Sequence, residues 1–189
     1  MRPSLSSRPR LRRGGVAPGA ATWDDAGMSP DPDPLVLRSL AAPDAAPAAA
    51  FIRMAFSAQP VPTDPPSSAL RETPEGVAAL LAEGGGFALS GAGGDAALIL
   101  FAERGGGLYC GRLAIHPALR GRGLARRLIA AAEEEGRRRG LARLWVKVRL
   151  ALPGNLALFA GLGFREVGRE AHPGYAAPTT AILEKALDA

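Results

Sequence analysis

The stretch Leu113-Ala-Ile-His-Pro-Ala-Leu-Arg-Gly-Arg-Gly-Leu-Ala125 contains the end of one apolar segment and the beginning of another. Its proline ends the first segment as a strand, because proline cannot donate a hydrogen bond to a sheet ladder. Gly121 and Gly123 let the backbone approach a ligand closely, since no Cβ stands in the way. The first turn of the following helix has unpaired N–H groups and a partial positive charge, to which Arg120 and Arg122 add. Taken alone, the stretch predicts an anion-binding turn; glycines that only tighten a turn are the alternative.

Two other phosphate-binding patterns do not fit the chain. It has no glycine-rich loop that ends in Gly-Lys-Ser or Gly-Lys-Thr. Gly91-Ala-Gly-Gly-Asp-Ala96 matches the glycine spacing of dinucleotide-binding folds, but the following Ala97-Leu-Ile-Leu-Phe101 is typical of a strand, where that fold needs a helix. We therefore interpret residues 91–95 as a hairpin turn.

The helix after the glycine turn has the clearest pattern in the chain. Leu124, Leu128 and Ala132 share one apolar face. Three glutamates, residues 133–135, each precede an arginine by one helical turn, an arrangement that favours ion pairs of about 0.2–0.5 kcal/mol each. Gly140 then provides a C-terminal stop. We interpret the three arginines mainly as residues that stabilise the helix.

The rest of the chain alternates between short strands and helices. Asp44 and Pro74 are a candidate N-cap and a candidate first residue for two early helices, and the proline-rich residues 59–68 are expected to form a loop. The order predicts an α/β domain, a mixed central β-sheet with flanking helices. The expected elements are strand 35–40, a helix from Asp44 through residue 55, a helix from Pro74, strands 87–90, 96–103 and 108–115, the long helix to residue 139, strand 144–148, helix 155–162, and strands 164–169 and 179–185.

Composition excludes several classes of protein. The chain has 189 residues, 47% of them hydrophobic and 22% charged, which suits one globular domain. The single cysteine, Cys110, cannot form an intrachain disulfide and is expected to be buried. His116 and His172 make a poor ligand set, so no metal is expected. No uncharged apolar run reaches the roughly 18 residues of a membrane helix, so we expect a cytoplasmic protein that does not contact a membrane.

The formal net charge of +5 is weak evidence for nucleic-acid binding, because many arginines stand in one terminal segment. Residues 1–33 are expected to form a disordered, basic, proline-rich tail, and residues 34–189 the domain. Met28 stands just before the first predicted strand and is a candidate for the true start. The arginines of the segment are Arg2, Arg8, Arg10, Arg12 and Arg13.

Two motifs resemble those of the GCN5-related N-acetyltransferases. Arg120-x-x-Gly123-x-Ala125, after the strand that ends in Leu113-Ala-Ile-His-Pro117, is similar to the acetyl-CoA signature of that family. Asn155-x-Ala-Leu-Phe-Ala-Gly-Leu-Gly-Phe164 is similar to its second motif, which ends in Gly-Phe. The resemblance spans about residues 35–187. It implies the acyl-CoA N-acyltransferase fold and transfer of an acetyl group from acetyl-CoA to a primary amine, by direct attack in a ternary complex.

The resemblance also implies roles for single residues. Backbone groups of Leu113, Ala114 and Ile115 are expected to hold the pantetheine arm and the thioester, where one N–H stabilises the developing oxyanion. Asn155 is expected to bond to the cofactor, and an N-cap of the short helix is its alternative role. The other residues expected at the cofactor site are Arg120, Gly121, Arg122, Gly123, Leu124, Ala125 and Phe159.

Phe159 is a departure from the family pattern. Family members often have a tyrosine there, which protonates the leaving thiolate, and a phenyl ring cannot donate a proton. Another group or water then does so, or the thiolate leaves unaided. An acyl-CoA-binding module without useful catalysis is therefore the alternative function, and a nucleic-acid-associated protein is a second rival.

Candidates for catalysis and acceptor binding lie outside the two motifs. Glu103, at a predicted strand end, is a candidate general base acting through water. Tyr175 and Tyr109 are further catalytic candidates, and His172 and Tyr175 are candidates for the acceptor pocket. Tyr109 and Arg112 are expected on opposite faces of their strand. The acceptor is expected to be a small-molecule or peptide amine of unknown identity, and a homodimer, common in the family, has no support in these residues.

Overall fold

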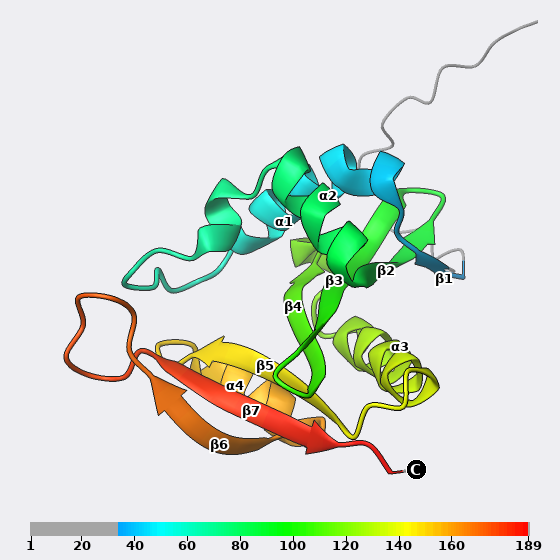
Figure 1. Cartoon of the computed structure of the whole chain (residues 1–189). Helices are drawn as coiled ribbons and strands as arrows, with labels where there is room; N and C mark the ends of the chain where they lie inside the picture. The colour runs from blue at the N-terminus through cyan, green and yellow to red at the C-terminus, as the bar shows by residue number, and fades with distance from the viewer. Residues whose placement is uncertain (1–33, 189) are drawn as a thin grey trace, which may run out of the picture.

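A sheet runs through the molecule, with helices on both of its faces (Figure 1). The structure is a computed structural model, and it describes residues 34–188. Within those residues seven strands form one mixed sheet and four α-helices accompany it, which confirms the predicted α/β class and order of elements. The elements are β1 (Val36–Ser39), α1 (Ala45–Ser57), α2 (Pro74–Glu83), β2 (Gly85–Gly91), β3 (Gly94–Arg104), β4 (Gly107–Ile115), α3 (Leu124–Arg138), β5 (Arg143–Arg149), α4 (Pro153–Gly161), β6 (Arg165–Glu170) and β7 (Thr180–Ala186), with short 3-10 turns η1 (Ala42–Asp44), η2 (Ser68–Arg71) and η3 (Pro117–Leu119).

The tail expected for residues 1–33 and the candidate start at Met28 lie outside the described residues.

The strands lie in the order β1-β2-β3-β4-β5-β7-β6. Each neighbouring pair is antiparallel except β4 and β5, which run parallel. A parallel pair needs a long crossover, and here α3 supplies it. The β2–β3 turn is tighter than the sequence predicts, because Gly91 already pairs with Gly94.

The core has two parts, one on each face of the sheet, because successive strand side chains point to opposite faces. Leu98 and Leu100 of β3 pack in one cluster with Ile52 of α1. Their neighbour Ile99 packs in the other cluster, together with Leu128 of α3. Cys110 is buried in this second cluster, as expected, and burial raises the pKa of its thiol to about 12.

Two predicted helix starts have different outcomes. Pro74 is the first residue of α2, and the Thr73 hydroxyl caps the helix by accepting from the Gly76 N–H at 3.1 Å. Asp44 directly precedes α1, but its carboxylate accepts from the N–H of Ala41 at 2.8 Å and does not cap α1. The 3-10 turn before α1 uses the carboxylate instead.

The ion pairs of α3 partly follow the predicted spacing. Glu135, whose side chain is 12% exposed, binds Arg138 at 2.7 Å and Arg139 at 2.6 Å. Glu134, which is 81% exposed, lies 3.7 Å from Arg137 and not beside Arg138 as predicted. Gly140 ends the helix with a φ of 70°, as its position predicts.

Candidate active site

β4 and β5 pair over a short length and then separate. The register pairs only Leu108 with Leu144 and Tyr109 with Trp145. Beyond Tyr109, β4 carries one residue more than β3, since Leu98 faces Ala114 whereas Leu100 faces Gly111. Such a bulge bends a strand and leaves part of its ladder unpaired.

Arg112 lies at this bulge, with a left-handed φ of 51° that side chains rarely adopt. Its guanidinium donates to the nearly buried carboxylate of Glu72 and to the Ser68 hydroxyl, at 3.2 Å for the latter. The conformation is therefore held by an ion pair to the segment between η2 and α2.

The gap between the strands belongs to a cleft of about 1140 Å³. Leu113, Ala114 and Ile115 line one wall. The opposite wall comes from β5 and α4, and the loop between α1 and α2 contributes to the side. Of the expected cofactor residues, all but Arg122 line this cleft.

The glycine turn opens onto the same cleft. Gly121 and Gly123 have φ values of 77° and 76°, and a Cβ built on either would meet no protein atom within 4 Å. Gly123 is the N-cap residue of α3 and provides no side-chain cap. The N–H groups of the first turn of α3 are therefore available to an anion in the cleft.

Three arginines near this turn have different positions. Arg120 donates to the carbonyls of Ala55 and Ala58 at 2.8 and 2.9 Å, so it holds the turn against the C-terminal end of α1. Arg122 is outside the cleft lining, whereas Arg126, in the first turn of α3, belongs to it. Arg126 was not among the residues expected at the cofactor site, although it stands only three residues after Gly123.

The second motif forms α4. Asn155 is the third residue of this helix, whose N-cap is Leu152, so the alternative role of Asn155 as an N-cap is wrong. Asn155 is exposed and lines the cleft. Phe159 also lines it, and packs edge to face against Phe164 with ring centroids 5.3 Å apart.

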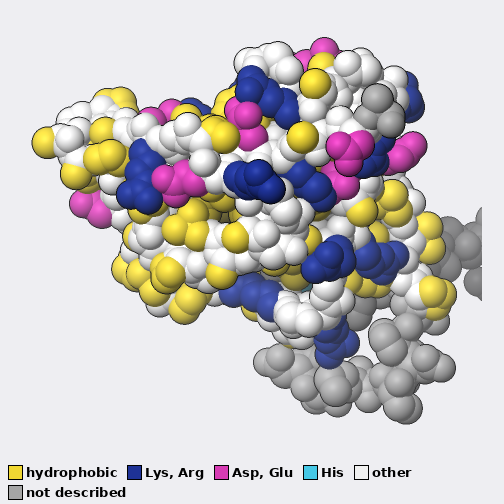
Figure 2. Space-filling model, turned by 90° about the horizontal axis from the view of Figure 1, so that it is seen from below, with side chains coloured by type: hydrophobic (Ala, Val, Ile, Leu, Met, Phe, Trp, Pro, Cys, Tyr) yellow, Lys and Arg dark blue, Asp and Glu magenta, His cyan; other side chains and the backbone are white. Residues whose placement is uncertain are grey.

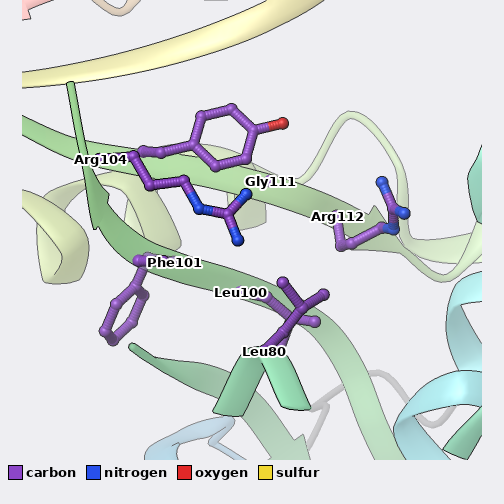
Figure 3. Close-up of a pocket in the computed structure, with 8 residues that line it drawn as sticks. Leu80, Leu100, Phe101, Arg104, Gly111 and Arg112 are labelled. Atoms are coloured by element: carbon purple, nitrogen blue, oxygen red, sulfur yellow. The ribbon is translucent and has the colours of Figure 1, made fainter. Parts of the chain in front are cut away.

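Tyr109 and Arg112 lie on the same wall, not on opposite faces as expected, because the bulge shifts the alternation of β4 by one residue. Both also line a smaller cavity of about 110 Å³ beneath α2, shown in Figure 3 with Leu80 and Arg104. Tyr109 packs against Trp145 with centroids 4.6 Å apart, and burial raises the pKa of its phenol.

Two loops far apart in the sequence meet beside the cleft. The loop between α1 and α2 and the loop between β6 and β7 project from the same side of the molecule (Figure 1). Tyr175 donates to Asp64 at 2.5 Å, and Arg149, at the end of β5, donates to the carbonyl of Pro65. The hydrogen bond to Asp64 raises the pKa of the Tyr175 phenol, and Tyr175 itself is outside the cleft lining.

His172 lines the cleft beside Arg149. Its Nδ1 lies 2.5 Å from the Thr179 hydroxyl and its Nε2 lies 2.6 Å from Nη1 of Arg149. Nδ1 also lies 2.9 Å from the same Nη1. Because Arg149 can only donate, one nitrogen of the imidazole accepts from it. Burial, followed by the charge of Arg149, lowers the pKa of His172 from its ordinary 6.5, which favours the neutral imidazole.

Glu103 is not brought to the cleft. It pairs with Leu108 at the end of β3, before β4 and β5 separate. Its side chain is 54% exposed and lies 3.5 Å from Arg139. Glu170 of β6 is instead the carboxylate that lines the cleft, and its strand position gave no signal of this in the sequence.

The described residues were also compared with the requirements of a metal site, a membrane-spanning helix and a basic nucleic-acid surface. Residues 34–188 hold no group of three or more His, Cys, Asp or Glu side chains placed to share a metal ion. No helix in that range combines the length and the apolar character that crossing a bilayer requires. On the face seen in Figure 2, Lys and Arg side chains stand among hydrophobic and acidic ones and form no continuous basic stripe.

Comparison with solved structures finds the same fold in acetyltransferases. The ribosomal-protein-S18-alanine N-acetyltransferase of Escherichia coli is 24% identical, with 82% of this chain and 94% of that chain covered and a TM-score of 0.60. The PaiA N-acetyltransferase of Thermoplasma acidophilum, solved in complex with coenzyme A, is 15% identical, with 80% and 98% covered and a TM-score of 0.65. A nourseothricin acetyltransferase is 22% identical, with a TM-score of 0.51 over 56% of this chain, which spans 66% of the length of that protein.

The sequence comparisons differ in outcome. No curated protein matches the chain significantly. The family model described as the acetyltransferase (GNAT) family matches residues 62–164, which is more than half of the chain and contains the bulge, the glycine turn and α4. The chain therefore belongs to the GNAT acetyltransferase family.

Proposed function

We propose that this protein transfers an acetyl group from acetyl-CoA to a primary amine by direct attack in a ternary complex. One observation carries the proposal: a single cleft joins the N-terminus of α3 to the gap between β4 and β5. An anion at the helix and an extended arm along the gap are what a coenzyme A thioester would present. The family membership supports the same reaction class.

The residues present fit acetyl-CoA. The N–H groups of the first turn of α3, together with Arg126, suit the pyrophosphate. Leu113, Ala114 and Ile115 offer backbone groups to the pantetheine arm along the unpaired part of β4, and Asn155 and Phe159 face it from α4. Backbone N–H groups at the bulge stabilise the charge that develops on the thioester oxygen, an effect that is typically worth about 3 kcal/mol.

Proton transfer is assigned to groups that line the cleft. We assign removal of the amine proton to His172, which lines the cleft, directly or through one water, in a state in which Arg149 no longer donates to its ring. Tyr109, which stays protonated because it is buried, remains a candidate donor to the thiolate. Without a donor the thiolate still leaves, because a thiol is far more acidic than an alcohol.

The test of this function is release of free CoA from acetyl-CoA with a panel of primary amines. Release that depends on both substrates, with the acetylated amine found by mass spectrometry, is the expected result. Binding of acetyl-CoA in calorimetry without release for any amine would instead support the acyl-CoA-binding module. Absence of binding would remove the acyltransferase function altogether.

Gly123→Glu tests the position of the cofactor. We expect it to weaken coenzyme A binding at least 100-fold, because a carboxylate then stands at the helix terminus where the pyrophosphate binds. Gly140→Glu is a matched control: Gly140 has a φ of 70° and open space around it, but lies at the other end of α3. Equal affinities of the two variants in calorimetry would exclude the glycine turn from the site.

The amine itself, the cytoplasmic location and the oligomeric state remain predictions.

A further inference from the structure

The charges that line the cleft are distributed unequally. Cationic side chains lie along its whole length, and Glu170 is the one carboxylate among its described lining residues. Arg120 and Arg126 lie near the glycine turn, in the part proposed for the cofactor. The cations in the remaining part, formed by η2, β4 and β5, are Arg71, Arg112, Lys147 and Arg149.

Two of these four cations are neutralised within the protein. Lys147 lies 2.7 Å from Glu170, the last residue of β6. Arg112 is paired with Glu72. The surplus positive charge of this part of the cleft therefore belongs to Arg71 and Arg149.

Arg149 is the more constrained of the two. It is half-buried, and its guanidinium contacts neutral groups, the carbonyl of Pro65 and the ring of His172. Within residues 34–188 no carboxylate lies at ion-pair distance from it, and the nearby Asp64 accepts from Tyr175. Burial accordingly lowers the pKa of Arg149. The charges of Tyr175 and Asp64 oppose this shift. A partly desolvated guanidinium with no carboxylate at ion-pair distance is a strong site for a carboxylate, which matches its planar donor pair.

Arg71 provides a second cation on the other side of the cleft. It is the last residue of η2, its side chain is exposed, and it lines the same cleft. Within the described part of the chain it has no hydrogen bond or ion pair. Its charge is therefore available to a bound molecule.

We propose that the acceptor is a small amine that also carries a carboxylate, bound by Arg149 with the support of Arg71. The inference rests on the proposed acetyl transfer and names its acceptor class. Because Arg149 touches His172, a carboxylate on Arg149 places the amine of the same small molecule beside the proposed base. The bond Tyr175–Asp64 joins two loops at this part of the cleft, and the bond Arg149–Pro65 ties one of them to the end of β5. These links favour a small molecule over a protein terminus.

The same charges disfavour other acceptors that the sequence left open. Polyamines and aminoglycosides are polycations, and their recognition needs an excess of carboxylates in the pocket. Here Glu170 is already paired with Lys147. Acceptors of these classes are therefore expected to be poor substrates.

The experiment compares kcat/KM for matched pairs of amines that differ in one charge. Each amino acid is compared with its carboxamide, and 4-aminobutyrate is compared with butylamine. Spermidine and phosphoethanolamine complete the panel. We expect at least a tenfold preference for the carboxylate in each pair. Arg149→Gln should reduce that preference 10-fold to 100-fold without changing the KM of acetyl-CoA, and Arg149→Lys should retain part of it.

Arg165→Gln is the matched control for net charge. Arg165 is exposed on β6 and is outside the cleft lining, so its loss should leave the preference unchanged. Faster turnover of carboxamides, spermidine or phosphoethanolamine than of the carboxylates would overturn the acceptor class and leave the transferase intact.

No CoA release with any amine would overturn the transferase instead. Calorimetry of the carboxylated amines in the presence of coenzyme A then decides the subsite. Binding to the wild type that is lost in Arg149→Gln supports the carboxylate site, and no binding, or equal binding to both, overturns it.

Discussion

His172 illustrates how neighbours set the chemistry of a single residue. The sequence made it a candidate for the acceptor pocket, but no pattern assigned it a role in proton transfer. The structure places its ring between the Thr179 hydroxyl and Arg149, with Lys147 and Glu170 as the other charges that act on it. Burial and the cations lower its pKa, while Glu170 opposes them. The result is an imidazole whose neutral form is favoured over its protonated form.

The pH profile of kcat/KM tests this residue. The imidazole must be neutral to act, so activity should fall as pH decreases through its lowered pKa, which lies below the ordinary 6.5. His172→Gln should reduce kcat/KM about 100-fold and remove this acidic limb. His116→Gln changes the other histidine and should keep the limb. An unchanged limb in His172→Gln would assign the titration to another group.

At the scale of an element, α3 combines an N-terminal end that is open to a ligand with a C-terminal end that is stabilised by ion pairs. Its N-terminal turn starts after Gly123, which provides no side-chain cap and so leaves N–H groups for a ligand. Its C-terminal turn holds Glu135 between Arg138 and Arg139. One end of the helix therefore leaves N–H groups open to a ligand, and the other end is held by ion pairs.

Glu135→Gln tests the stabilised end. The hydrogen bonds from Arg138, with those from Arg139, lower the pKa of Glu135 to about 2, against an ordinary 4.5. A carboxylate with a lowered pKa stabilises the folded state above pH 4.5, and this contribution is lost as pH falls toward 2. We expect the substitution to lower the free energy of unfolding by about 1–2 kcal/mol at pH 7, after allowance for solvent screening.

The matched control is Glu134→Gln, because Glu134 is 81% exposed and should contribute less than about 0.5 kcal/mol. Urea unfolding of both variants at pH 7 and pH 2.5 measures the difference. Equal stability of Glu135→Gln and the wild type at pH 7 would contradict the assigned role.

At the scale of the whole molecule, the cleft depends on segments that lie far apart in the chain. The loop between α1 and α2 reaches the loop between β6 and β7, where Asp64 accepts from Tyr175. Arg149 makes a second link, from the end of β5 to Pro65. These links close the proposed acceptor side of the cleft without contacting the glycine turn.

Tyr175→Phe removes one link and keeps the ring. One hydrogen bond contributes about 0.5–1.5 kcal/mol net, so the KM of the acceptor should rise roughly 2-fold to 12-fold. The KM of acetyl-CoA should stay the same, because the link joins two loops and does not contact the glycine turn. Asp64→Asn preserves an oxygen that can accept from Tyr175 and should have a smaller effect. Equal changes in both KM values, measured by CoA release, would show that the loops do not act on the acceptor alone.

Local patterns in the sequence were sufficient to predict the strands and helices and to identify the glycine turn proposed for the cofactor. Alternation and helical periodicity depend on neighbouring residues, and so predicted the order of strands and helices that the structure shows. Gly121 and Gly123 were informative for the same reason, since a left-handed turn before a helix is a property of a few consecutive residues.

The surroundings of the acceptor were decided by tertiary structure. The bulge at Arg112 depends on how β4 pairs with β3, and it placed Tyr109 and Arg112 on one wall. The position of Glu103 outside the cleft, and of Glu170 inside it, depends on where β4 and β5 separate. The physical reason is that the charge and proton affinity of such groups depend on partners distant in sequence, which only the folded chain brings within a few ångströms.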